Sequence, residues 1–256
     1  MARIFITGSS TGLGLIAAQR LIERGHQVTL HARNQQRAAD LRPEIGEAPI
    51  VVGDLASIAE TRDVAEQANR IGRHDAVIHN AGVYRLPQRV ETVDGLCLTF
   101  AVNVLAPYLL TVLIDRPDRL TYLTSGLHSS GRETLDDAQW TRRPWDWMQA
   151  YAESKLYDTM LALGVARRWP KVHANAVNPG WVPTRMGGSG APDDLELGAA
   201  TQVWLAAGDD PAAAVSGQYF YHGRAEPVPA SARQAAGQEA LFRYCAELTG
   251  ETLGEA

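Results

Sequence analysis

A tyrosine and a lysine stand four residues apart in the segment YAESK, at Tyr151 and Lys155. Residues with this spacing lie on one face of an α-helix, one turn apart. A phenol has an ordinary pKa near 10, and a neighbouring ammonium favours its ionised form. The spacing therefore permits proton transfer from Tyr151 at neutral pH, although surface helices also contain such pairs by chance.

Two more polar side chains are candidates for the same chemistry. Ser125, in YLTSG, follows a strand-like apolar run and could hydrogen-bond a substrate oxygen, or it could cap the strand; Ser129 and Ser130 offer rival hydroxyls. Asn103, in AVNVLAP, lies in a helical pattern, where its amide could instead satisfy buried backbone groups. Tyr157 is a competing tyrosine, but no lysine follows it at four residues.

The glycine-rich segment TGSSTGLG (7–14) joins the first strand-like run to a helical pattern. Glycines here permit a tight turn and let backbone amides approach a pyrophosphate at the helix N-terminus, where the helix dipole favours anions. A tight turn alone is the simpler alternative, and serines are common in turns. The predicted cofactor contacts in this segment are Gly8, Ser9, Ser10, Thr11, Gly12, Leu13 and Gly14.

The second strand-like run ends in HARN, with Arg33 where an NAD-preferring enzyme would place an acidic residue. A guanidinium suits the 2′-phosphate of NADP, because it offers a planar fork of charged donors. An exposed arginine in a polar turn is the alternative. We expect NADP(H) as the cofactor, in preference to NAD(H).

Three later segments could complete a dinucleotide site. In VVGDLAS, Asp54 and Leu55 could bracket the adenine, although Asp54 could equally be the N-cap of the next helix. In HNAG, small residues would let the chain pass beneath the cofactor, and the amide of Asn80 could bond neighbouring strands. In NPGWVPT a turn would bring the backbone of Val182 and the hydroxyl of Thr184 to the nicotinamide carboxamide. The last two segments contribute the predicted contacts Asn80, Ala81, Gly82, Pro179, Gly180, Val182 and Thr184.

The elements that must position these residues alternate between strands and helices, which is typical of βαβ units and a parallel sheet covered on both faces. The predicted strands are Arg3–Thr7, Gln27–His31, Ile50–Gly53, Ala76–His79, Leu120–Thr124, His173–Asn178 and Gly217–Tyr221. The predicted helices are Gly14–Arg24, Ser57–Ile71, Val93–Leu113, Ala150–Arg168 and Asp194–Ala207, with a further helical stretch ending near Leu248. We therefore predict an α/β fold with one domain over residues 1–256, a Rossmann-type doubly wound parallel sheet of about seven strands.

Seven of these segments, in this order, resemble the short-chain dehydrogenase/reductase family, in its compact single-domain branch. They are TGSSTGLG, Asp54, HNAG, Asn103, Ser125, YAESK and NPGWVPT, and they span nearly the whole chain. The segment YLTSGLH and the long gap before the tyrosine look most like retinol-dehydrogenase-like and carbonyl-reductase-like members. HNAG departs from the usual NNAG, and the short DRPD segment (115–118) departs from the usual length.

The resemblance implies roles for four catalytic residues. Tyr151 would be the general acid in carbonyl reduction and the general base in alcohol oxidation, and Lys155 would lower its pKa and bind the nicotinamide ribose. Ser125 would hold the substrate oxygen. Asn103 would fix a water that links Lys155 to solvent. The resemblance also implies a homodimer or homotetramer built on the helix of Tyr151.

Composition narrows the function classes. The net charge of −5 gives no basic surface for nucleic acid, and no apolar run approaches the roughly 20 residues of a membrane span. The two cysteines lack metal-ligand spacing and could form at most one bridge, and no metal site is expected. With no signal peptide apparent, we expect a cytoplasmic protein.

Two loops are predicted to line a substrate pocket, 131–149 and 184–194, together with Tyr84–Pro87. The apolar side chains Trp140, Trp145, Trp147, Met148 and Trp181 would suit a moderately hydrophobic carbonyl or alcohol, or would only pack the loop onto the body. The loop 185–192 would close over bound ligand. The alternatives to an oxidoreductase are an inactive NADP(H)-binding sensor and a sugar-nucleotide epimerase or dehydratase. The sequence does not name the substrate, the direction or the stereochemistry.

Overall fold

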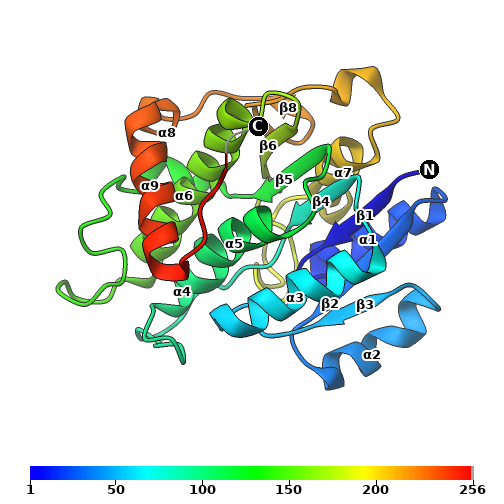
Figure 1. Cartoon of the computed structure of the whole chain (residues 1–256), viewed down its shortest axis with the longest axis horizontal. Coiled ribbons are helices and arrows are strands. Elements are labelled where there is room, and N and C mark those ends of the chain that lie inside the picture. Colours follow the sequence, from blue (N-terminus) through cyan, green and yellow to red (C-terminus); the bar gives the residue numbers. More distant parts are fainter. Residues whose placement is uncertain (255–256) are drawn as a thin grey trace.

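The computed structural model describes residues 1–254 of the chain. Within this range eight strands form one sheet, in the order β3-β2-β1-β4-β5-β6-β7-β8 (Figure 1). Every pairing from β3 to β7 is parallel, and only β8 runs antiparallel, against β7. The predicted doubly wound parallel sheet is thus confirmed, with one two-residue strand added at its edge.

All seven predicted strands are present, with bounds that differ by at most two residues. They are β1 (Arg3–Ile6), β2 (Gln27–Ala32), β3 (Ile50–Val52), β4 (Ala76–His79), β5 (Arg119–Leu123), β6 (His173–Asn178) and β7 (Tyr219–Tyr221), followed by β8 (Arg224–Ala225). Most of their residues are buried, because helices cover both faces of a parallel sheet.

The α-helices are α1 (Gly12–Glu23), α2 (Gln35–Ile45), α3 (Ile58–Ile71), α4 (Leu98–Phe100), α5 (Ala106–Leu113), α6 (Trp147–Arg168), α7 (Leu195–Ala207), α8 (Ala230–Arg233) and α9 (Ala235–Thr249). A π-helical turn, Ala101–Leu105, joins α4 to α5. The helix predicted from Val93 begins only at Leu98, because Gly95 turns the chain with φ +75° and Glu91 forms a β-bridge to Cys97.

Helix α2 is absent from the prediction. It buries only Leu41 and Ile45 and contains Pro43, so its sequence shows no wide apolar stripe. Its N-cap is Asn34, whose side chain accepts a hydrogen bond from the Arg37 amide. The segment HARN is therefore the junction between β2 and helix α2.

Two apolar clusters hold the helices to the sheet. On one face, residues of α1, α2 and α7, including Leu21, Leu41 and Val203, pack against Ile4 and Ile6 of β1. On the other face α3, α5 and α6 pack against strand residues that include Phe5 of β1, Val77 of β4 and Leu120 of β5. The sheet is thereby covered on both sides, as the alternating pattern predicts.

Helix α9 lies beside α6 and α5 and covers the side of α6 turned away from the sheet (Figure 1). Residues 150–165 of α6 are all buried within the described chain. Gly164 lies directly against the Phe242 ring of α9, since a Cβ built on it would stand 2.6 Å from that ring. Residues 150–165 leave no exposed face on which the expected homodimer or homotetramer could be built. The oligomeric state stays a prediction.

Some features that would indicate another function class are missing from residues 1–254. None of the described helices has the length and apolar character needed to cross a membrane. The described residues also show no grouping of three or more His, Cys, Asp or Glu side chains that could hold a metal ion. Cys97 and Cys245 are both buried free thiols, so they form no bridge with each other.

Candidate active site

The predicted site residues follow the carboxyl ends of six neighbouring strands. The strand order reverses between β1 and β4, which is the switch point where open α/β sheets bind ligands. The glycine-rich turn follows β1, and HNAG follows β4. The segments that follow β2, β3, β5 and β6 start at the same edge of the sheet, because these strands are parallel. Helix α6 begins at this edge and brings Tyr151 to it.

Tyr151 is 9% exposed and lies in the second turn of α6. Asp146 caps this helix by accepting hydrogen bonds from the Met148 and Gln149 amides. Burial raises the pKa of the Tyr151 phenol, while the charge of Lys155 and a side-chain hydrogen bond with Ser125 lower it. The structure therefore brings Tyr151, Ser125 and Lys155 together, as predicted, although the expected lowering of the pKa is outweighed by burial.

Lys155 is held between two acceptors. Its Nζ donates to the Leu123 carbonyl at 2.7 Å and to Oδ2 of Asp158 at 2.7 Å. Both side chains are almost fully buried. Burial opposes the ammonium charge, but Asp158 raises the pKa of Lys155 above its ordinary value. Sequence reasoning missed Asp158, although an acid three residues after a lysine on a helix is a recognisable pair.

Asn103 lies in the π-helical turn and is fully buried. Its Oδ1 accepts from the Val83 amide at 2.7 Å, and its Nδ2 donates to the Val83 carbonyl and to the Ser154 hydroxyl. A Cβ built on Gly82 would lie 3.4 Å from Asn103 Oδ1 and 3.7 Å from Lys155 Nζ. Asn103 thus satisfies backbone groups, which was the alternative, and also borders the space beside Lys155.

The glycine-rich turn is tightly packed. Gly8 has φ +61°, and a Cβ on it would stand 2.8 Å from the Ala81 Cα. A Cβ on Gly14 would stand 2.5 Å from Asn80 Nδ2 and 2.7 Å from the Gly8 carbonyl oxygen. Asn80 Nδ2 donates to the Thr7 and Gly8 carbonyls at 3.0 Å each. The structural role foreseen for the Asn80 amide is therefore present, and both glycines are required by contact.

His31, at the end of β2, fixes this turn and was missed from the sequence. Its Nδ1 accepts from the Gly8 amide at 3.0 Å, so its proton is on Nε2, 2.8 Å from the Gly53 carbonyl. Burial lowers the pKa of His31 and keeps the ring neutral. The Ser9 hydroxyl is buried and donates to the Ile6 carbonyl, while accepting from the His31 amide. The hydroxyl hydrogen of Ser9 is therefore used within the protein, and Ser9 as a cofactor contact stays a prediction.

The segment after β3 resolves one alternative. The N-cap of α3 is Ser57, whose hydroxyl accepts from the Glu60 amide. Asp54 instead closes a short turn by accepting from the Ala56 amide at 3.0 Å. Asp54 is therefore not the helix cap, and its place beside an adenine stays a prediction. Arg33, after β2, is exposed at the same edge.

The segment after β6 meets the glycine-rich turn. A Cβ on Gly12 would lie 3.7 Å from the Thr184 methyl group. On α7, a Cβ on Gly198 would meet both Leu13 and Val182. The Thr184 hydroxyl accepts from the Gly187 amide, so its own hydrogen can still be donated. The two halves of the predicted cofactor site thus lie in contact.

Aromatic rings border Tyr151 on the substrate side. The Tyr84 ring lies 4.5 Å from the Tyr151 ring, and the Trp147 ring meets Tyr84 edge-on at 5.3 Å. The Arg85 guanidinium stands over the Tyr84 ring at 5.0 Å. Trp181, in the loop after β6, is 52% exposed. Tyr84 and Trp147 therefore form the aromatic surface beside Tyr151.

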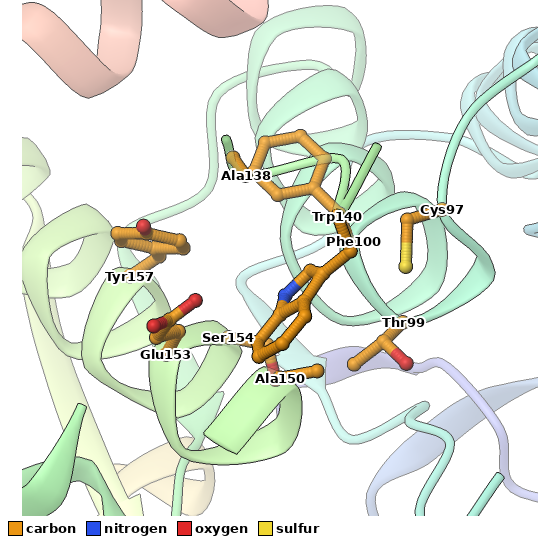
Figure 2. Close-up of a pocket in the computed structure, with 9 residues that line it drawn as sticks. All are labelled: Cys97, Thr99, Phe100, Ala138, Trp140, Ala150, Glu153, Ser154 and Tyr157. Atoms are coloured by element: carbon orange, nitrogen blue, oxygen red, sulfur yellow. The ribbon is translucent and has the colours of Figure 1, made fainter. Parts of the chain in front are cut away.

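Trp140 and Trp145 lie elsewhere. Trp140 is 6% exposed and stacks under the Arg143 guanidinium, and the Trp145 indole donates to the Leu86 carbonyl. Figure 2 shows Trp140 at the centre of a small cavity, with Glu153 and Tyr157 on one side and Cys97 and Thr99 on the other. These two tryptophans therefore pack the loop onto the body, which was the alternative to a substrate contact.

Comparison with known proteins agrees with this geometry. A family model described as short chain dehydrogenase matches residues 2–194. The short-chain dehydrogenase chyC of Penicillium rubens is 43% identical over 256 residues, covering 98% of each chain. DnrU of Streptomyces sp. (strain C5), a candidate daunorubicin C-13 ketoreductase, is 32% identical over 269 residues, covering 97% of this chain and 93% of its own. A blue fluorescent protein from a metagenomic library, solved in complex with NADPH, superposes with a TM-score of 0.68 at 25% identity, covering 86% of this chain and 95% of its own.

Proposed function

The chain belongs to the short-chain dehydrogenase family, and from this membership and the site geometry we propose that it is an NADP(H)-dependent carbonyl reductase or alcohol dehydrogenase with Tyr151 as general acid and base. The observation that supports this most directly is the convergence of three side chains. Ser125 lies close enough to the Tyr151 phenol to lower its pKa, and Lys155 lies one helical turn away on the same helix. This set is what proton transfer to a carbonyl oxygen requires.

The residues present fit a dinucleotide. Among the described residues, Thr11 at the N-cap of α1 makes no side-chain capping bond, so the first amides of this helix remain available to an anion. Gly8 and Gly12 both have positive φ, which keeps the turn open to close backbone approach. A Cβ built on Gly12 would lie 3.7 Å from the Thr184 methyl group, so the segment after β6 runs beside this helix end. A pyrophosphate would lie on the α1 amides, with Pro179–Thr184 around the nicotinamide.

Arg33 favours NADP(H). It is exposed directly after β2, at the edge where the adenosine ribose of a Rossmann ligand lies. No acidic side chain lies at the end of β2. The strand ends at Ala32, and the chain continues through Arg33 and Asn34. A 2′-phosphate would therefore meet a fixed positive charge, while a 2′-hydroxyl would lack its usual carboxylate partner.

The chemistry assigned to this chain is proton supply and charge stabilisation. When bound, a reduced nicotinamide supplies a hydride to the carbonyl carbon. Tyr151 donates its phenolic proton to the carbonyl oxygen as that oxygen gains negative charge. Ser125 hydrogen-bonds the same oxygen and holds it within reach. Lys155 stabilises the phenolate that remains, and solvent returns the proton by way of the space beside Asn103 and Gly82.

The substrate we propose is a moderately hydrophobic ketone, aldehyde or the corresponding alcohol. Tyr84 and Trp147 offer aromatic surface near Tyr151. The similarity to DnrU, a candidate daunorubicin C-13 ketoreductase, supports a ketone as substrate.

The test is an assay of purified protein with NADPH and a panel of aldehydes, ketones and quinones, followed at the nicotinamide absorbance. We expect oxidation of NADPH with at least one bulky aromatic carbonyl, and slower turnover with NADH. Tight NADPH binding with no turnover across the panel would instead identify the chain as a cofactor-binding sensor. Binding of neither nicotinamide would contradict the proposal entirely.

A further inference from the structure

Asp158 is a buried acid that the proposed mechanism does not use. It lies three residues after Lys155 on α6, and its Oδ2 accepts from Lys155 Nζ at 2.7 Å. Its side chain is 3% exposed and that of Lys155 is 5% exposed. Two opposite charges are thus enclosed together one turn from Tyr151.

A buried ammonium needs a counterion. Removing a charge from water costs several kcal/mol, and an unpaired buried lysine usually loses its proton instead. The other acceptor of Lys155 is the neutral Leu123 carbonyl. Within the described residues, Asp158 forms the ion pair with this lysine, so its negative charge compensates the ammonium.

The rest of the Asp158 environment is neutral. The titratable groups that feel its charge are Lys155 and Tyr151 on its own helix and Tyr122 on β5. Burial raises the pKa of Tyr122 above its ordinary range, so that phenol stays protonated. His79 of β4 stacks on Tyr122 at 4.7 Å, and burial lowers its pKa to about 3. Both therefore remain uncharged beside the ion pair at neutral pH.

Other polar contacts around this ion pair are also uncharged. Tyr122 is engaged with the Thr111 hydroxyl at 2.7 Å, so it is already hydrogen-bonded. Oδ1 of Asp158 has no hydrogen-bond partner among the described residues. The carboxylate is therefore directed to Lys155 through a single oxygen.

We propose that Asp158 is a positioning residue for proton transfer: its carboxylate keeps Lys155 in the charged form and in place beside Tyr151 in the buried site. The inference rests on the proposed function for the roles of Tyr151 and Lys155. Tyr151 and Lys155 titrate as a coupled pair, and a nearby negative charge raises the pH at which the pair releases its first proton. The protonated phenol, which is the form that reduces carbonyls, is thereby retained to higher pH.

The lysine content makes a direct measurement possible. The chain contains two lysines, Lys155 and Lys171, and Lys171 is exposed. Protein labelled with 13C at lysine Cε therefore gives two lysine resonances, which the Lys171→Arg variant assigns. In the wild type we expect the Lys155 resonance to titrate at or above the midpoint of Lys171. A Lys155 midpoint clearly below that of Lys171 would overturn the proposal without any active-site variant.

Asp158→Asn is the decisive variant. We expect the Lys155 midpoint to fall by about 1–3 pH units, the usual effect of one close opposite charge, and the alkaline limb of carbonyl reduction to move to lower pH. Asp158→Glu restores the charge, so it should recover at least part of both shifts even if the amide variant folds poorly. Unchanged Lys155 titration in folded Asp158→Asn would refute the counterion role.

Glu153→Gln is the matched control. Glu153 is an equally buried acid on α6, but it pairs with Arg143 and not with Lys155. Its substitution should leave the Lys155 midpoint and the alkaline limb in place, and a shift like that of Asp158→Asn would show a general effect of destabilising α6. A normal Lys155 shift in a protein without turnover would contradict the proposed function and leave this inference standing.

Discussion

Tyr84 and Tyr151 lie ring against ring, with centroids 4.5 Å apart and planes at 56°. Tyr84 belongs to the segment after β4, whereas Tyr151 is on α6. The contact between the two rings therefore joins the segment after β4 to helix α6. Burial is the main cause that raises the pKa of Tyr151, and the neighbouring Tyr84 adds to it. One aromatic side chain therefore covers the Tyr151 phenol.

Tyr151→Phe should abolish most turnover. Removing a general acid typically lowers the rate by about 100- to 10,000-fold, while the ring, and with it the contact to Tyr84, is kept. Tyr157→Phe is the control, because that hydroxyl donates to the Thr134 carbonyl and not to the site. We expect kcat to fall only in Tyr151→Phe, with NADPH affinity retained in both. Full activity in Tyr151→Phe would exclude the proposed mechanism.

Two tryptophans of the same loop region should behave differently. Trp147→Ala removes a ring that contacts Tyr84 at the surface, so KM for aromatic ketones should rise while the melting temperature changes little. Trp140→Ala removes a buried ring and should lower the free energy of unfolding by about 3–5 kcal/mol. Steady-state kinetics and urea unfolding separate the two effects. If Trp140→Ala raised KM without loss of stability, the packing role assigned to Trp140 would be wrong.

Arg33→Ala should weaken NADPH binding selectively. A charge-assisted hydrogen bond contributes about 1.5–3 kcal/mol, which corresponds to about a tenfold to 100-fold change in affinity. NADH has no 2′-phosphate, so its affinity should not change. Calorimetric titration with each nucleotide measures both affinities. Arg24→Ala is the control, because Arg24 is exposed at the C-terminal end of α1, away from the predicted pyrophosphate site at its N-terminal end. Equal losses for NADPH and NADH would contradict the cofactor assignment.

Stability should decrease in mild acid. Burial lowers the pKa of His79 to about 3 and that of His74 to about 4, whereas in the unfolded chain a histidine has a pKa near 6.5. Between these values the unfolded state binds more protons, and each histidine destabilises the fold by about 1.4 kcal/mol per pH unit as the pH falls. Asp158 acts in the opposite direction, because burial raises its pKa to about 6, so the folded state binds one proton there first.

Urea unfolding between pH 7 and pH 5 tests this linkage. His79→Asn removes one of the neutral buried rings, so its free energy of unfolding should depend less steeply on pH than that of the wild type. Identical slopes in His79→Asn and the wild type would show that His79 is not held neutral.

The sequence predicts the sheet well because parallel strands buried on both faces appear as short apolar runs. The same rule fails for α2, whose exposed and polar surface gives no periodic signal. The helix that contains Asn103 was predicted to begin at Val93, and this was wrong for another reason. Gly95 and the bridge between Glu91 and Cys97 turn the chain locally, and neither is visible in hydrophobic spacing.

The site residues also differ in how far the sequence predicts them. Residues at strand ends, such as Ser125 and the turn at Gly8, are placed by topology and could be predicted. The helical spacing of Asp158 and Lys155 is visible in the sequence, but the burial of the pair is not, and the contact of His31 with Gly8 exists only in the folded chain. Ser9 was predicted as a cofactor contact from its place in the glycine-rich turn, whereas its hydroxyl donates to the Ile6 carbonyl of the preceding strand.

The placement of α9 has a consequence for the order in which the molecule is completed during synthesis. Residues 235–249 emerge from the ribosome long after α6, yet they cover the apolar side of the helix that contains Tyr151. Until then, that side is exposed to solvent and to other chains, as is common for folding intermediates of larger domains. Helix α6 is therefore among the last parts of the molecule to reach its final packing.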